Sequence, residues 1–245
     1  MASFKVVAIS NFKGGVGKTT STVNIGAALA EAKKRVLLID LDPQFNLSRS
    51  LGVKEDLNIY GALRGDYPLP IVQRNEFLHV VPSALELIKA ETEFVSEYKR
   101  EEKLNTLLKT LPPQYDYVLI DCPPSLGVLA QMAYTSADMI FVPIQSEYLA
   151  LTGYSVLVEA IDRIGLEIDG AFVTQFDQRQ ILDRTILEKL KTMVGDKLFK
   201  NIIRQNVAIA ESTTTGQSIF EYAPSSKGAA DYRALANEIM LKFEK

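Results

Sequence analysis

Six short apolar runs, separated by segments with helical periodicity, constrain the fold of this 245-residue chain more than any other feature. The runs cover residues 4–10, 35–40, 77–83, 115–122, 139–144 and 168–176, and several are almost continuous in Val, Ile, Leu and Phe. Runs of this kind are typical of strands that are covered on both faces, as in parallel sheets. A weaker run of the same type spans residues 198–204.

Helical spacing of apolar residues lies between these runs. It predicts helices near 19–33, 98–110, 125–136, 150–164 and 180–194, and a last helix at about 228–243. Regular alternation of strand and helix predicts an α/β fold with a single doubly wound, mostly parallel sheet and helices on both faces. Residues 43–76 are rich in turn formers, so we expect them to be irregular and mobile. The charge-dense segment 86–103 is expected to be a solvated helix face rather than an interaction tail.

Composition excludes several kinds of site. The single cysteine, Cys122, rules out an internal disulfide, and the single histidine, His79, argues against a histidine-based zinc site or a Ser-His-Asp triad. No apolar run approaches the roughly 18 to 20 residues of a membrane span, and the start lacks a secretory layout, so we expect a cytoplasmic protein. Net charge is −3, with residues 177–245 at +2 and residues 1–176 at −5. This asymmetry permits a basic patch in the last third without demonstrating one.

A glycine-rich loop, "SNFKGGVGKTTS" (10–21), stands between the first predicted strand and the first predicted helix. This is the context that a phosphate-binding loop requires. Glycines allow backbone N–H groups to turn toward phosphate oxygens, and the helix that follows adds its own free N–H groups. In this interpretation Lys18 reaches the β- and γ-phosphates and Thr19 gives its hydroxyl to Mg²⁺. The alternative is a glycine turn with incidental lysines.

The generic phosphate-loop pattern fails at its first letter, where Phe12 replaces glycine. The observed K-G-G-V-G-K-T-T resembles the deviant phosphate loop of the ParA/MinD group of P-loop ATPases. That resemblance implies binding of ATP and Mg²⁺. It also implies that Lys13 crosses a homodimer interface and stabilises charge on the nucleotide of the partner subunit, as an arginine finger does. The nucleotide-contacting residues implied by the loop are Lys13, Gly14, Gly15, Val16, Gly17, Lys18, Thr19 and Thr20.

Two aspartate signatures follow later strands. "LLIDLDPQFN" (37–46) matches the D-x-D-P-Q pattern of the family, which implies that Asp42 orients or activates the attacking water and that Asp40 supports the Mg²⁺ site. A capped turn with Asp42 as N-cap is an alternative that could coexist with this role. "YVLIDCPPS" (117–125) has four apolar residues before Asp121, which predicts a carboxylate near Mg²⁺, acting through water.

The resemblance covers nearly the whole chain. "PIQSEYLALTGYSVLVEAI" (143–161) is similar to a family segment near the dimer face, and "TQFDQR" (174–179) occupies the adenine-side region. "NVAIAES" (206–212) and "FEYAPSSKGAADY" (220–232) match C-terminal family segments, and Asn206 is expected to contact the nucleotide. We therefore expect residues 1–245 to be one P-loop ATPase domain without the N-terminal DNA-reading domain of larger members.

Three functions remain open at this point. The first is a ParA-type partition ATPase that binds DNA non-specifically as an ATP dimer, with a ParB-like or other adaptor and a nucleoid-associated location. The second applies the same ATP cycle to a protein cargo. The third, a MinD-like membrane ATPase, requires an amphipathic tail that the chain end "NEIMLKFEK" does not offer, so we expect no membrane partner. Ala208 stands where many members carry a basic residue, and each lysine taken alone is also compatible with ordinary solvated surface. The expected DNA contacts are Lys197, Lys200, Arg204 and Lys227.

Overall fold

A computed structural model describes residues 4–244 and contains a seven-stranded sheet in the order β3-β4-β2-β5-β1-β6-β7. All neighbouring strands pair in parallel except β3 with β4. The sheet confirms the predicted doubly wound, mostly parallel α/β fold. The strands are β1 (Lys5–Ile9), β2 (Val36–Asp40), β3 (Val72–Gln73), β4 (Leu78–Val81), β5 (Tyr117–Asp121), β6 (Met139–Gln145) and β7 (Gly170–Thr174).

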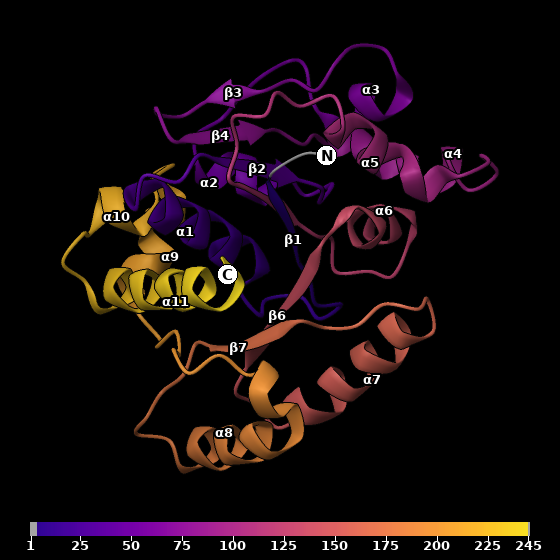
Figure 1. The fold of residues 1–245 in the computed structure, drawn as a ribbon. Helices are drawn as coiled ribbons and strands as arrows, with labels where there is room; N and C mark the ends of the chain where they lie inside the picture. Colours follow the sequence, from indigo (N-terminus) through magenta and orange to yellow (C-terminus); the bar gives the residue numbers. More distant parts are fainter. Residues whose placement is uncertain (1–3, 245) are drawn as a thin grey trace.

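Helices connect these strands and cover both faces of the sheet (Figure 1). Three short 3₁₀ helices accompany them: η1 (Leu85–Lys89), η2 (Arg100–Glu102) and η3 (Gly195–Lys197). The α-helices are α1 (Lys18–Glu31), α2 (Asn46–Ser50), α3 (Ile59–Arg64), α4 (Ala90–Glu93), α5 (Lys103–Leu108), α6 (Val128–Ser136), α7 (Ala150–Asp162), α8 (Ile181–Val194), α9 (Val207–Thr214), α10 (Ile219–Tyr222) and α11 (Lys227–Phe243).

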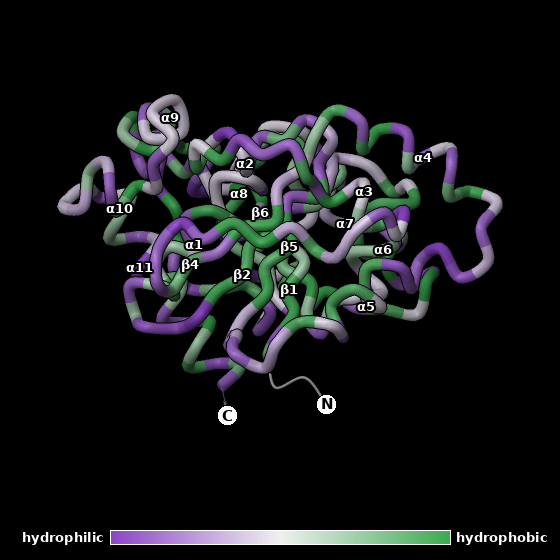
Figure 2. The backbone as a smooth tube through the Cα atoms, turned by 90° about the horizontal axis from the view of Figure 1, so that it is seen from above, coloured by the Kyte–Doolittle hydropathy of each residue, from purple (hydrophilic) through white to green (hydrophobic). Residues whose placement is uncertain are grey.

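The hydrophobic core has two layers because successive strand residues point to opposite faces of the sheet. In β1, Val7 and Ile9 pack against the layer of α1, α2, α10 and α11, whereas Val6 and Ala8 pack against the layer of α5, α6, α7 and α8. Figure 2 shows the strands as a mainly hydrophobic band in the middle of the molecule, with hydrophilic segments toward the outside. Burial on both faces explains why the strand sequences read as continuous apolar runs.

The weak run 198–204 does not form a regular strand. It pairs with β7 and the residues after it through two isolated bridges, Ala171 with Leu198 and Phe176 with Arg204, and the amides of Phe199 and Ile203 donate to carbonyls of β7. Carboxylates of α11 bind three further amides of the segment. Glu238 accepts from the amides of Lys200 and Asn201, and Asp231 accepts from the amide of Arg204. The segment is therefore held between the sheet and α11.

Two other segments are more ordered or more divided than expected. Residues 43–76 are not irregular throughout, because they contain α2, α3 and β3, and the fully buried Leu47, Leu51 and Ile59 anchor the short helices. Segment 86–103 is not one solvated helix face. It is divided among η1, α4 and η2, and its buried Leu87 and Phe94 belong to the core.

The strand order places the carboxyl ends of β2, β5 and β1 side by side. In open α/β sheets, ligands bind at this edge, where loops leave neighbouring strands. Asp40, Asp121 and the glycine loop follow these three strands and therefore meet at one place. Among the helices of residues 4–244, none is both long enough and apolar enough to cross a bilayer.

Candidate functional site

The glycine loop joins β1 directly to α1. Gly15 and Gly17 have φ values of +77° and +91°, in the left-handed region that disfavours residues with a Cβ. Gly17 is also the N-cap of α1, so the free N–H groups of the first helical turn face the same concavity as the loop. The loop is therefore arranged to receive an anion.

Side-chain donors bind three carbonyl groups of the loop. The Lys18 Nζ donates to the carbonyl of Lys13 at 3.0 Å, and Lys18 is only 6% exposed. At the end of β7, Thr174 Oγ1 donates to the carbonyl of Val16 at 2.7 Å, and Gln175 Nε2 donates to the carbonyl of Gly15 at 2.6 Å. The sequence resemblance places this strand end on the adenine side and does not predict its contact with the loop. The available signal is the polar pair Thr174 and Gln175, which ends a buried strand at the ligand edge of the sheet.

Asp40 and Asp121 lie next to each other, because they are register partners at the ends of β2 and β5. Thr19 Oγ1 donates to Asp121 Oδ2 at 2.7 Å. Asp121 Oδ1 is buried and has no hydrogen-bond partner among the described residues. The Asp40 carboxylate instead accepts hydrogen bonds from the amide and hydroxyl of Ser48, at 2.9 and 2.7 Å.

These contacts fit a magnesium ion. Mg²⁺ prefers oxygen ligands and usually takes only one or two from the protein, with water and phosphate supplying the others. The Thr19 hydroxyl and the unpartnered Oδ1 of Asp121 are of this type. In Asp40, by contrast, Oδ2 accepts both bonds from Ser48 and Oδ1 accepts from the amide of Asp42. Within residues 4–244 there is no cluster of three or more His, Cys, Asp or Glu side chains that could hold a metal alone.

Asp42 lies just beyond β2 and is 6% exposed. Its Oδ1 accepts a hydrogen bond from the amide of Gln44 at 2.9 Å, and its carbonyl accepts one from Ser83 Oγ at 2.8 Å. Asp42 thus caps a turn. It is not the N-cap of a helix, because α2 begins only at Asn46 with Phe45 as its N-cap. The second carboxylate oxygen, Oδ2, makes no hydrogen bond within residues 4–244.

The charges of the site perturb one another. Burial raises the pKa of Asp40 to about 7, despite the hydrogen bonds from Ser48. Burial, together with the negative charge of Asp40, raises the pKa of Asp121 well above its usual range. Burial also raises the pKa of Asp42 and lowers that of Lys18, although the charges of Asp121 and Asp42 oppose the change at Lys18. Perturbed groups of this kind concentrate at functional sites.

Lys13 is only partly exposed, with 38% of its side chain accessible. Its ammonium group forms an ion pair with Glu147 of the same subunit, in the loop between β6 and α7. Its amide donates to Asn11 Oδ1 at 3.0 Å. Within one subunit, the Lys13 ammonium is therefore held by a carboxylate, while the Lys13 carbonyl accepts from Lys18.

A cavity of about 370 Å³ opens beside the loop and is lined by Gly17, Thr20, Asn206 and Tyr232 among others. Asn206 is the N-cap of α9, and its Oδ1 accepts a hydrogen bond from the amide of Ala208 at 2.9 Å. The structure therefore brings Asn206 close to the glycine loop, although 186 residues separate Asn206 from Thr20 in the sequence. Of the predicted nucleotide contacts, Gly17, Thr20 and Asn206 line this cavity together.

The four expected DNA contacts do not form one patch. Lys197 ends η3 just before segment 198–204 and Lys200 lines a cavity there, whereas Arg204 and Lys227 line a separate cleft at the other end of the segment. Lys197 is paired with Glu167 at 2.7 Å and Arg204 with Asp231 at 2.5 Å.

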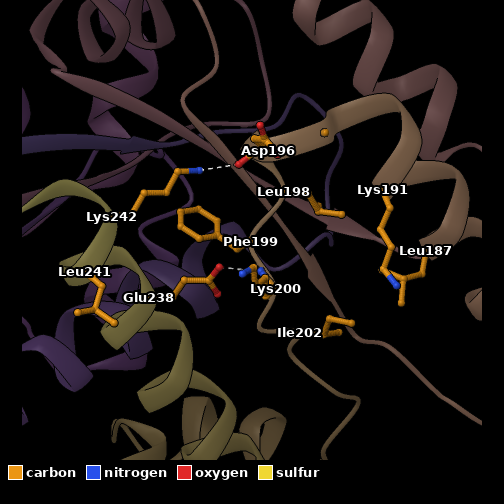
Figure 3. Close-up of a pocket in the computed structure, with 11 residues that line it drawn as sticks. Leu187, Lys191, Asp196, Leu198, Phe199, Lys200, Ile202, Glu238, Leu241 and Lys242 are labelled. Atoms are coloured by element: carbon orange, nitrogen blue, oxygen red, sulfur yellow. Dashed lines mark hydrogen bonds between the residues drawn. The ribbon is translucent and has the colours of Figure 1, made fainter.

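Lys200 and Lys227 differ from these two paired residues. The side chain of Lys227 has no ion-pair partner within residues 4–244, and it is exposed at the first position of α11. Lys200 lines a cavity of about 500 Å³ between α8 and α11. Figure 3 shows this cavity, in which Glu238 accepts from the Lys200 amide and the Lys242 ammonium donates to the Asp196 carbonyl.

Comparison with known proteins gives consistent matches. A family model described as an AAA domain matches residues 4–174. A chromosome partitioning protein ParA from Myxococcus xanthus is 40% identical over 248 residues, which cover 96% of this chain and 88% of that protein. A chromosome-partitioning ATPase Soj from Treponema pallidum is 39% identical over 247 residues, which cover 97% of this chain and 98% of that protein.

A solved structure agrees with this fold over almost the full length. It is described as cobyrinic acid a,c-diamide synthase from Mycobacterium smegmatis with bound ADP and magnesium. It superimposes with a TM-score of 0.85 at 32% identity, covering 99% of this chain and 97% of that chain.

Proposed function

This chain belongs to the family of ParA and Soj chromosome-partitioning ATPases, and on that premise we propose that it is a Mg²⁺-dependent ATPase that dimerises with ATP and then binds DNA without sequence preference. An adaptor protein would stimulate hydrolysis, and the cycle would segregate or position DNA on the nucleoid. The observation that carries this proposal is the convergence of one loop and three aspartates at a single sheet edge. There, Thr19 donates to Asp121, the buried Lys18 ammonium binds a loop carbonyl, and Asp42 has one carboxylate oxygen without a hydrogen bond among the described residues.

Each group has a role that follows from its position. The loop N–H groups and the Lys18 ammonium would bind the phosphates, and the cavity beside Asn206 would receive the base and ribose. Thr19 and Asp121 would hold Mg²⁺, which when bound neutralises charge on the phosphates. The free oxygen of Asp42 would accept a hydrogen bond from the attacking water and orient it.

Lys13 is the group that requires a second subunit. Its own subunit would supply Lys18 to the phosphates, and the Lys13 ammonium pairs with Glu147 instead. In a dimer, Lys13 could leave Glu147 and contact the phosphates of the nucleotide that is bound to the facing subunit. Charge that develops during phosphoryl transfer would then be stabilised from outside, in a closed interface from which water is excluded.

The decisive experiment compares Lys13→Ala with Lys54→Ala, a control at an exposed lysine far from the loop in sequence. Lys13→Ala should bind ATP, remain monomeric in sedimentation experiments and lose ATP hydrolysis. Lys54→Ala should dimerise and hydrolyse ATP as the wild type does. If Lys13→Ala forms a dimer that hydrolyses ATP at the normal rate, the cross-subunit role is wrong.

DNA binding has its own test. We expect binding that requires ATP rather than ADP and that weakens steeply with salt, because contacts to phosphates release counterions. Lys227→Ala should weaken binding more than Lys197→Ala, since Lys197 already pairs with Glu167. Binding that is equal with and without nucleotide, or that is insensitive to salt, would contradict the proposal.

A further inference from the structure

The end of β7 makes two contacts with the glycine loop that the proposed function does not assign. Thr174 Oγ1 donates to the carbonyl of Val16 and Gln175 Nε2 donates to the carbonyl of Gly15. Thr174 is 2% exposed, and neither bond joins residues close in sequence, the two spanning 158 and 160 residues. Two adjacent residues of one strand end thus bind two adjacent carbonyls of the loop.

The backbone at Gln175 makes this double contact possible. Consecutive side chains of an extended strand point to opposite faces, so Thr174 and Gln175 would not both reach the loop from a regular strand. Gln175 has a φ of +54°, a left-handed conformation that residues with a Cβ rarely adopt. This turn ends β7 and interrupts the alternation at the position where the second contact is made.

These contacts determine the direction of two loop N–H groups. In a trans peptide unit, the carbonyl and the following N–H point in opposite directions. Among the described residues no peptide bond is cis. The Gly15 carbonyl shares its unit with the Val16 N–H, and the Val16 carbonyl shares its unit with the Gly17 N–H. When the two carbonyls are held by β7, the two N–H groups are turned to the opposite side.

The same logic applies to the bond from Lys18 Nζ to the Lys13 carbonyl, which turns the Gly14 N–H. Three loop N–H groups are thus oriented by side-chain donors that bind the loop carbonyls. Two of these donors come from β7, the strand that also lines the cavity beside the loop through Thr174 and Gln175. Anything bound in that cavity would touch the residues that orient the loop.

We propose that Thr174 and Gln175 are positioning residues of the phosphate loop, which fix the Val16 and Gly17 N–H groups toward the phosphates. This inference rests on the proposed nucleotide-binding function and extends it to two residues outside the loop. The two residues orient backbone donors before the ligand arrives, so their loss weakens binding of phosphate groups more than binding of the base.

Three substitutions separate this role from general stabilisation. Thr174→Val keeps the shape of the side chain and removes the donor, whereas Thr174→Ser keeps the donor and should restore function. Gln175→Asn keeps a residue type that tolerates the left-handed backbone, but its side chain is one methylene shorter and cannot reach the Gly15 carbonyl. Because Gln175 is exposed, the Gln175→Asn protein should fold even if a protein with a substitution at the buried Thr174 does not.

Affinity for two probes, Mg²⁺–ADP and adenosine, is measured by calorimetry on the full chain. Thr174→Val and Gln175→Asn should each weaken ADP binding roughly 3- to 10-fold, the usual effect of losing one hydrogen bond. Adenosine, which has no phosphate but occupies the cavity that these residues line, should lose clearly less affinity than ADP. Controls are Thr185→Val, which removes a hydroxyl bond to a carbonyl within α8, and Gln73→Asn on β3.

The outcomes are distinct. Unchanged ADP affinity in both variants, or an equal loss for ADP and adenosine, would refute the positioning role while leaving the proposed function intact. Failure of Thr174→Ser to restore ADP affinity would also count against it. Wild-type protein that binds neither probe would instead overturn the proposed function.

Discussion

Asp40→Asn should change the stability of the nucleotide-free protein in opposite directions at low and high pH. Asp40 is fully buried, and its pKa is raised from an ordinary value of 3.8 to about 7, chiefly by burial. A raised pKa means that the native state binds more protons than the unfolded state. The stability contributed by Asp40 is therefore fully present below about pH 4 and is lost as the pH rises through about 7.

The size of the effect follows from the pKa. Each unit of difference is worth 1.36 kcal/mol, so ionisation of Asp40 costs about 4 kcal/mol at pH 8. Asparagine avoids that cost. It loses the 3.3 Å bond from the Asp42 amide and the charge-assisted strength of the Ser48 bonds, together about 1 to 2 kcal/mol. The variant should be more stable by about 2 to 3 kcal/mol at pH 8 and less stable by about 1 kcal/mol at pH 4, where ionisation of Asp40 costs little.

Urea unfolding followed by circular dichroism measures this difference, because the chain has no tryptophan for fluorescence. Samples contain EDTA and no nucleotide. In thermal unfolding at pH 8, the melting temperature should rise by about 5 to 10 °C, since 1 kcal/mol shifts the melting temperature of a chain of this size by about 2 to 4 °C. Asp66→Asn, an exposed carboxylate in an ion pair with Arg64, should have little effect at either pH. A stability change in Asp40→Asn that is the same at pH 4 and pH 8 would refute the reasoning.

Three further predictions concern other parts of the molecule. Glu147→Gln releases Lys13 from its ion pair, so the ATP-dependent dimer should form at about 2- to 5-fold lower protein concentration in light scattering. Gly170→Ala places a Cβ 2.5 Å from the Phe199 ring, which should cost about 1 to 3 kcal/mol of unfolding free energy in urea. Burial, assisted by the charge of Arg35, lowers the pKa of His79 below 6.5, so the native state binds fewer protons than the unfolded state. Wild-type stability relative to His79→Gln should therefore fall below pH 6.5 and be constant above it, as measured by urea unfolding at a series of pH values.

The fold was largely predictable because its strongest signals are local. Each of the six apolar runs contains a strand of the sheet, since a strand buried on both faces must be apolar throughout. The antiparallel β3 has only two residues, too few for any periodicity to indicate it. Segment 198–204 has the composition of a strand, but carboxylates on α11 bind its amides, and such a contact across 27 to 38 residues leaves no local signal.

The site was predictable to a similar extent and for a similar reason. The loop, Asp40, Asp42 and Asp121 each follow a strand, so the sheet brings them to one edge. The contacts of Thr174 and Gln175 were not predictable, because they depend on one left-handed residue and on a neighbour about 160 positions away.

Charge pairing limits what a count of lysines and arginines says about DNA contacts. Four basic residues were expected to contact DNA, yet two of them are paired with acidic residues 30 and 27 positions away. Arg204 makes several hydrogen bonds to Asp231, so a DNA phosphate must compete with a carboxylate that is 91% buried on its side-chain surface. Losing Arg204 would leave that carboxylate without its partner, at a cost to stability. Substitution of Arg204 would therefore change both protein stability and DNA binding, whereas Lys227→Ala should change DNA binding alone.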